Sequence, residues 1–325
     1  MTDRQTRRPS RRERNVLRLR TPDDILSAVP FLLRFHPEES FVFLALKGKT
    51  LVLTARVDIG KEPVGVEALA DHFARLCVQH EGDGLIVVAY TDRVARISAV
   101  LDDLVEALEP IEVHEALVTD GRSWWSRLDE EGRPGVGIPV DSGSSEVAAQ
   151  AVFAGLPALP SRAALADSVA GPSGADAAEL SGVFEDVLME LADLSDEDRR
   201  ERICLLVESF CVHRRALSRS ECAELAVLAY EIELRDLAAQ RIRLADAELH
   251  VELWHQVVAN TVAPFESAPL CLLGLAAWVS GSGALMVVCI ERAEEINPDY
   301  SLLEILERIN ACALPPHAWE GINAA

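Results

Sequence analysis

Three aspartates follow predicted strands in the first half of the chain, where their carboxylates could hold a metal ion. Asp58 stands in RVDI, Asp92 ends AYTD and Asp120 ends LVTD. If these strands run parallel, the three carboxylates reach one carboxyl edge of a sheet, where open α/β sheets bind ligands. They could then bind Mg²⁺ for a hydrolase or phosphotransferase. The alternative is structural, because aspartate also caps helices and begins turns. The strand before Asp58 pairs in a hairpin, which leaves its direction open.

A second candidate is the segment HPEES, which places a histidine, two glutamates and a serine in succession from His36 to Ser40. A base beside a nucleophile is the arrangement of covalent catalysis. Catalytic groups meet from distant elements, however, and sequence neighbours rarely aim at one atom. We therefore interpret the segment as the turn between a helix and a strand, with Glu38 and Glu39 in solvent.

Trp124 and Trp125 are neighbours on a predicted strand, so their side chains face opposite ways. We expect one in the core and the other exposed or covered by another part of the protein, rather than a platform for a ligand.

No Walker loop, dinucleotide fingerprint, nucleophile elbow or H-E-x-x-H pair occurs in the chain. The seven cysteines include no C-x-x-C pair and lie mostly in apolar helical settings, which favours reduced thiols in the cytoplasm. The first 30 residues lack the apolar segment of a signal peptide. No cofactor is predicted, apart from Mg²⁺ if the aspartates converge.

The charge of the chain is divided between a basic tail and an acidic body. Residues 1–20 hold eight arginines against two acids, a net +6. The net charge of −22 for the whole chain therefore leaves −28 on the remaining residues. An acidic body repels nucleic acid and anionic lipid, so only the tail could bind a polyanion. The candidate contacts in this tail are Arg7, Arg8, Arg11, Arg12 and Arg14.

The apolar patterns predict an α/β sheet domain followed by an all-α domain of helical hairpins. Thr21 and Pro22 begin the first helix, which Pro30 should interrupt. FVFLAL and LVLTARVDI then form a hairpin, and strands alternate with helices as far as residue 141. The predicted parts are a disordered tail at 1–20, the α/β domain at 21–141, a connector with short helices at 142–175 and the helical domain at 176–325.

One uncharged stretch, residues 267–290, is long enough to span a bilayer. The sequence Ser-Gly-Ser-Gly at 280–283 divides it into two shorter segments, so we expect a buried helical hairpin and no membrane contact. Leu273-Gly274, Ala293 and Pro298 have a spacing similar to that of a tetratricopeptide helix pair.

Several stretches occur together in a recognisable order: DDILSAVPFLLRFHPEESFVFLAL, TARVDI, VVAYTD, PSRAAL, ELRDLA and LLGLAAWVSGSGAL, then ERAEEINPDYSLLEILERINACALPPHAW. As a set they resemble the actinobacterial family called domain of unknown function 4192, over most of the chain after residue 20. The resemblance implies an actinobacterial cytosolic protein and transfers no activity. Members of that family usually have glycine where Arg34 stands and an acidic residue near Ser282. If either position serves a ligand in the family, that role is changed here.

The sequence therefore predicts a cytoplasmic, non-enzymatic adaptor or regulator that binds a protein partner, or a second copy of itself, through its helical domain. The alternative function is that of an enzyme, a metal-assisted hydrolase or phosphotransferase that uses the strand-end aspartates. A third possibility is nucleic-acid binding through residues 1–20 alone.

Overall fold

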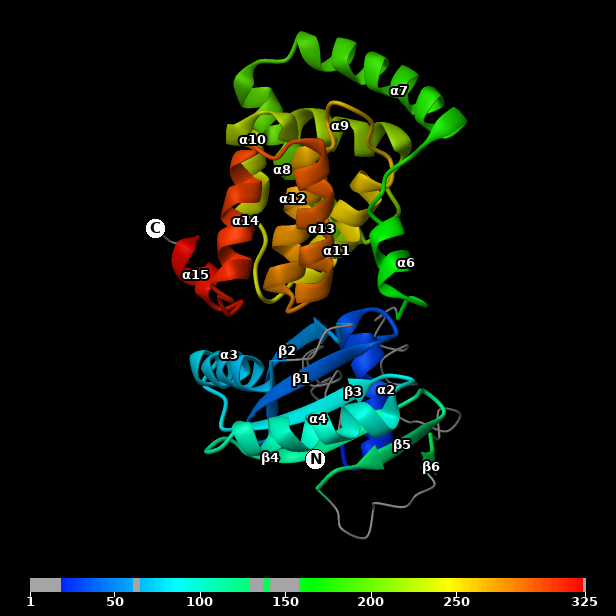
Figure 1. The fold of residues 1–325 in the computed structure, drawn as a ribbon. Coiled ribbons are helices and arrows are strands. Elements are labelled where there is room, and N and C mark those ends of the chain that lie inside the picture. The colour runs from blue at the N-terminus through cyan, green and yellow to red at the C-terminus, as the bar shows by residue number, and fades with distance from the viewer. Residues whose placement is uncertain (1–18, 61–64, 129–136, 141–157, 324–325) are drawn as a thin grey trace, which may run out of the picture. The chain divides into compact units, whose positions relative to one another are not determined.

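A computed structural model describes residues 19–60, 65–128, 137–140 and 158–323 (Figure 1). The chain divides into two compact units, Met1–Arg162 and Ala163–Ala325. The first contains a sheet with helices and the second contains helices, which confirms the predicted fold class. The arginines predicted to bind polyanions, residues 7–14, lie outside the described residues.

The first unit is built on a mixed sheet of six described strands in the order β2-β1-β3-β4-β5-β6. These strands are β1 Ser40–Lys47, β2 Thr50–Asp58, β3 Gly84–Tyr90, β4 Glu112–Thr119, β5 Ser123–Ser126 and β6 Ile138–Pro139. The hairpins β1–β2 and β5–β6 are both antiparallel, as the sequence predicts. β1 also runs antiparallel to β3, and β3 runs parallel to β4. β2, β3 and β4 therefore point the same way.

Among the described residues of this unit, three helices cover the sheet: α2 Pro22–Leu33, α3 Val66–Gln79 and α4 Val94–Ala107. α3 and α4 lie on one face and α2 lies on the other (Figure 1). The α3/α4 face is the apolar core, where Phe73 stacks on Phe43 with ring centroids 3.5 Å apart. Alternate residues of each strand enter this core because successive side chains of a strand face opposite sides.

Both ends of α2 follow from local chemistry. Thr21 and Asp24 form a capping box, in which each side chain accepts a hydrogen bond from the other residue's amide. The prediction that Pro30 would interrupt the helix was wrong, because α2 continues through this buried proline for another turn. The helix ends at Arg34, whose φ of 68° is in the left-handed region that favours glycine. A glycine at this position in relatives therefore has a backbone explanation that requires no ligand.

The second unit consists of helices in its described residues. They are α6 Arg162–Asp167, α7 Gly174–Ala192, α8 Asp196–His213, α9 Arg219–Tyr230, α10 Ile232–Ala239, α11 Ala247–Val258, α12 Ser267–Val279, α13 Gly283–Ile296, α14 Ser301–Ala311 and α15 Ala318–Ile322. The sequence predicts one helix over residues 220–239, but the chain becomes extended at Glu231, which pairs with Arg199 of α8. The helix predicted over these residues is therefore divided into α9 and α10.

The uncharged stretch at 267–290 forms α12 and α13, joined by a turn at Ser280–Ser282 as the sequence predicts. Every residue of α12 is buried, because other helices of the unit surround it. In the part of the chain that the structure describes, no helix has both the length and the apolar character to cross a bilayer.

Alternate helices of this unit stack in sequence order. α8, α10, α12 and α14 begin at residues 196, 232, 267 and 301, that is, 36, 35 and 34 residues apart. Each of the four contacts the next. Ion pairs join α8 to residues at either end of α10, with Arg199 on Glu231 at 2.6 Å and Arg241 on Glu208 at 3.3 Å. This geometry is that of stacked helical hairpins.

The stack of Phe73 on Phe43 generates a prediction about stability. Phe73→Ala should lower the free energy of unfolding by about 3–5 kcal/mol, since a buried ring is lost and a cavity remains. Val78→Ala is the control on the same helix, because Val78 is 70% exposed and its loss should cost no more than about 0.5 kcal/mol. Urea unfolding measures both, and equal losses would contradict this description of the core.

Candidate functional site

The common direction of β2, β3 and β4 creates one polar edge on the sheet. The last residue of each strand lies at this edge, and so does the first residue of the antiparallel β1. Cross-strand pairing places Asp58, Ser40, Tyr90 and Thr119 in one row across it. We call this the carboxyl edge, and it is the side of an α/β sheet on which ligands bind.

The three predicted aspartates all reach the carboxyl edge, but their carboxylates are engaged differently. Asp58 forms an ion pair with Arg56 of its own strand at 2.5 Å. Asp120 accepts hydrogen bonds from the amides of Arg122 and Ser123, which is a turn-forming role. Asp92 is exposed, and its carboxylate makes no hydrogen bond or ion pair with described residues.

The spacing of the strands separates these carboxylates. β1 lies between β2 and β3, so the strands that end near Asp58 and Asp92 are two spacings, or about 10 Å, apart. One Mg²⁺ needs its oxygen ligands at about 2.1 Å. Among the described residues no three His, Cys, Asp or Glu side chains come together to hold a metal ion. The described residues thus do not present a preformed site of the kind that Mg²⁺ requires.

Glu39, which the sequence places in solvent, is instead the residue that joins the loops of this edge. Its carboxylate accepts hydrogen bonds from the Thr91 hydroxyl at 2.7 Å and from the Asp92 amide at 3.0 Å. The same carboxylate pairs with the Arg93 guanidinium, whose Nε lies at 3.1 Å. The backbone oxygen of Glu39 accepts from the amide of Ile59 at 2.7 Å. One residue therefore connects the start of β1 to the segments that follow β2 and β3.

The environment of Glu39 keeps its carboxylate charged. Burial acts to raise its pKa, but the hydrogen bonds from Thr91, Arg93 and the Asp92 amide, together with the charge of Arg93, hold that pKa below its ordinary value of 4.5. Its φ of 39° is uncommon for a residue with a side chain, and such backbone occurs where the surroundings over-determine it. Sequence reasoning missed this role because its partners are more than 50 residues away.

His36 lies on the surface of the turn before β1. Its side chain is exposed and its amide donates to the carbonyl of Leu159 at 2.9 Å. Phe35 forms the adjacent bridge to Leu159, which ties this turn to the end of the first unit. Of the adjacent tryptophans, Trp124 is buried and Trp125 is half-buried.

In the helical unit, burial suppresses several groups that could act as nucleophiles. Cys211 and His250 lie 3.8 Å apart, but burial raises the pKa of Cys211 to about 11 and lowers that of His250. Both groups are therefore neutral at physiological pH, unlike a thiolate–imidazolium pair. Burial likewise raises the pKa of Cys222 and of Cys271 to about 12. These thiols act as small apolar side chains.

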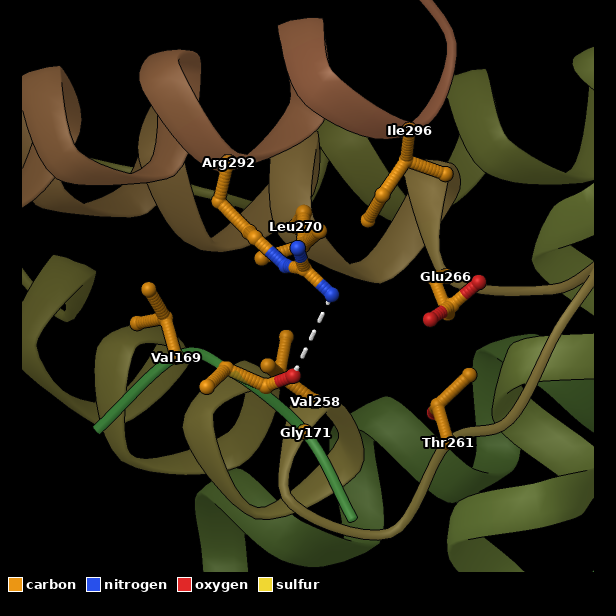
Figure 2. A pocket seen from close by; sticks show the side chains of 9 residues that line it. Val169, Gly171, Val258, Thr261, Glu266, Leu270, Arg292 and Ile296 are labelled. Atoms are coloured by element: carbon orange, nitrogen blue, oxygen red, sulfur yellow. Dashed lines mark hydrogen bonds between the residues drawn. The ribbon is translucent and has the colours of Figure 1, made fainter. Parts of the chain in front are cut away.

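A small hollow in the helical unit lies beneath Arg292 (Figure 2). It encloses about 200 Å³ of empty space with open solvent included, and the room within it is about that of one water molecule. The Arg292 guanidinium already donates to Glu295 at 2.9 Å and to the carbonyl of Ala170 at 3.5 Å. The remaining wall is mostly apolar, with Glu266 and Thr261 on the side away from Val169 (Figure 2). The hollow is consistent with packing between helices.

Comparison with known proteins places the chain in a family. The family described as Domain of unknown function (DUF4192) matches residues 22–317, which is most of the sequence, and the chain belongs to it. The chain matches no curated protein and no solved structure.

The contacts of Glu39 generate a prediction about stability and pH. Glu39→Gln should lower the free energy of unfolding at pH 7 by about 1 kcal/mol, a value already reduced because the carboxylate is 43% exposed and screened by solvent. Because the folded-state pKa is depressed, the charged carboxylate stabilises the fold above pH 4.5. That contribution is lost as the pH falls below 4.5 through the folded-state value, and the two proteins should converge in acid.

Urea unfolding at a series of pH values measures this difference. Glu38→Gln is the matched control, since the exposed Glu38 contributes its backbone oxygen rather than its carboxylate to the contact with Arg56. A Glu39→Gln protein as stable as Glu38→Gln at pH 7 would show that the carboxylate does not join the loops.

Proposed function

We propose that this family member is a non-enzymatic adaptor or regulator whose helical unit binds a protein partner through α8. The observation that carries the proposal is that α8 is apolar on two opposite sides. Ile203, Val207 and Phe210 face the interior. Leu205 and Val212, one heptad apart on the opposite side, are 54% and 73% exposed. A helix with apolar side chains on two opposite sides is most stable when other protein segments cover both sides and exclude water from them.

The charges around this second side favour a basic partner. Glu201, Leu205, Glu208 and Val212 follow the spacing of a single helical stripe, which we call the α8 stripe. The stripe belongs to residues 21–325, which together carry a net charge of −28. A partner segment that is helical, apolar on one side and rich in lysine or arginine is complementary to it.

The neutral state of the buried thiols and of His250 supports a binding role over a catalytic role in this unit. The stacking of α8, α10, α12 and α14 supports the same conclusion, since stacked hairpins commonly present surfaces to other proteins. The similarity to a tetratricopeptide pair stays a prediction. The free state of the cysteines supports a cytoplasmic location, and the family resemblance supports an actinobacterial origin.

A second candidate function is metal-assisted hydrolysis or phosphoryl transfer at the carboxyl edge. The specific observation in its favour is that Asp58, Asp92 and Asp120 share one edge, with Asp92 unengaged by the described residues. A substrate phosphate could supply the ligands that the protein lacks, since Mg²⁺ is often held by one or two carboxylates together with phosphates.

The adaptor proposal predicts the effect of a double substitution. Leu205→Glu with Val212→Glu should leave the melting temperature unchanged, since both side chains are exposed, and should weaken partner binding at least about tenfold. Val78→Glu in α3 is the control, with a side chain 70% exposed in the other unit. The partner is first captured on the wild-type chain, and its affinity for all three proteins is then measured by calorimetry. Equal affinities for the three proteins, or no saturable partner, would contradict the proposal.

The hydrolase candidate predicts a response to magnesium. Mg²⁺ with a nucleoside triphosphate should raise the melting temperature by about 2 °C through mass action, and Asp92→Asn should abolish the rise. Asp103→Asn, at an exposed position of α4, should retain it. A rise that survives in Asp92→Asn, or no rise in the wild type, would remove this candidate.

A further inference from the structure

The exposed side of α8 has an ordered pattern of charge along the helix. The α8 stripe begins with Glu201, and the same side of the preceding turn carries Glu197 and Asp198. These three acids come first, and the exposed Leu205 and Val212 come later in the helix. The first half of this side therefore suits cationic groups, and the second half suits apolar groups.

Two of the acids on this side are available to a new cation. Glu208 already pairs with Arg241 at 3.3 Å. The carboxylates of Glu197 and Glu201 make no ion pair or hydrogen bond with described residues. The arginines on the flanks of the helix do not neutralise them, because each of these arginines pairs with a glutamate outside α8: Arg199, Arg200 and Arg202.

The complementary pattern occurs in residues 4–19 of the same sequence. Six arginines come first in this segment, and Val16, Leu17 and Leu19 follow them. Residues 4–18 of the segment lie outside the described residues. Its 16 residues reach at most about 55 Å when extended and about 24 Å as a helix, whereas the 18 residues of α8 span about 27 Å. The segment is therefore long enough to follow the exposed side of α8.

We propose that residues 4–19 of one copy of the chain bind the α8 stripe of a second copy, in the same direction as α8. The arginines of the segment then lie beside Glu197 and Glu201, and its apolar residues cover Leu205 and Val212. This inference rests on the proposed role of the α8 stripe as a docking surface, and it names a second copy of this chain as the occupant.

The charges at the far end of α8 determine the direction of the segment. Arg214 and Arg215 follow Val212 at this end of the helix. They would repel the arginine-rich part of the segment, so the apolar part faces them. The arginine-rich part then lies at the acidic start of α8, where attraction is strongest.

Local attraction between the two copies overcomes their general repulsion. Each copy carries a net charge of −22, but repulsion between whole molecules is screened beyond about 8 Å at physiological salt. The segment itself carries seven arginines against Glu13, a net +6, and these charges act at contact distance. In a two-fold pair each copy donates one segment and receives one, so the contact is made twice.

Sedimentation equilibrium of the full chain between about 1 and 200 µM tests the proposal. The wild type should dimerise in this range. The dimer dissociation constant should rise at least about tenfold in a stripe variant that carries Glu201→Lys and Leu205→Lys. It should rise as much in a segment variant that carries Arg7→Gln, Arg8→Gln, Arg11→Gln, Arg12→Gln and Arg14→Gln.

The two variants change the net charge in opposite directions, so their common loss of dimer cannot come from net charge. Glu185→Lys with Met189→Lys on α7 is the matched control, because both side chains are exposed and have the same spacing as Glu201 and Leu205. This control should dimerise like the wild type. A monomeric wild type, an unchanged dissociation constant in the stripe or segment variant, or an equal loss in the control would overturn the proposal.

The same experiment separates this proposal from the adaptor role on which it rests, because it uses the purified chain alone. A chain that stays monomeric yet binds a captured partner through Leu205 and Val212 would overturn the second copy as occupant and leave the adaptor role intact. A dimer that is lost in the stripe and segment variants, without any captured partner, would support the second copy and contradict the adaptor role.

Discussion

The placement of β1 between β2 and β3, antiparallel to both, is the constraint on which the α/β unit depends. It makes β2 and β3 point the same way, so that their ends share one edge with the end of β4. It also brings the start of β1, and with it Glu39, to that edge. The charge-assisted bonds of the Glu39 carboxylate then fix the segment that follows β3, and its backbone oxygen holds the segment that follows β2. A rigid edge of this kind can hold polar groups that a mobile loop could not position.

The helical unit is organised by burial rather than by a polar contact. Every residue of α12 is buried, so this apolar helix depends on the neighbouring helices that cover it. The same burial makes the thiols of Cys222 and Cys271 and the imidazole of His250 poor participants in chemistry.

The sequence predicts the order of elements well because apolar periodicity and turn residues are local signals. The hairpin at Lys47–Lys49, the cap at Thr21 and the break at Ser280–Ser282 are each encoded within a few residues. Pro30 was misjudged because its lost hydrogen bond is tolerated inside a helix that is buried along one side.

The candidate site was less accessible to sequence reasoning. Asp58, Asp92 and Asp120 could be assigned to strand ends, but whether the strands share a direction depends on the position of β1. The role of Glu39 and the row from Asp58 to Thr119 depend on cross-strand register, which sequence neighbours do not reveal.

A crystal structure of the full chain tests most directly whether one residue joins the segments of the carboxyl edge. The account predicts the Glu39 carboxylate within hydrogen-bond distance of the Thr91 hydroxyl, the Asp92 amide and the Arg93 guanidinium. A Glu39 carboxylate turned to solvent, with none of these three donors beside it, would contradict it.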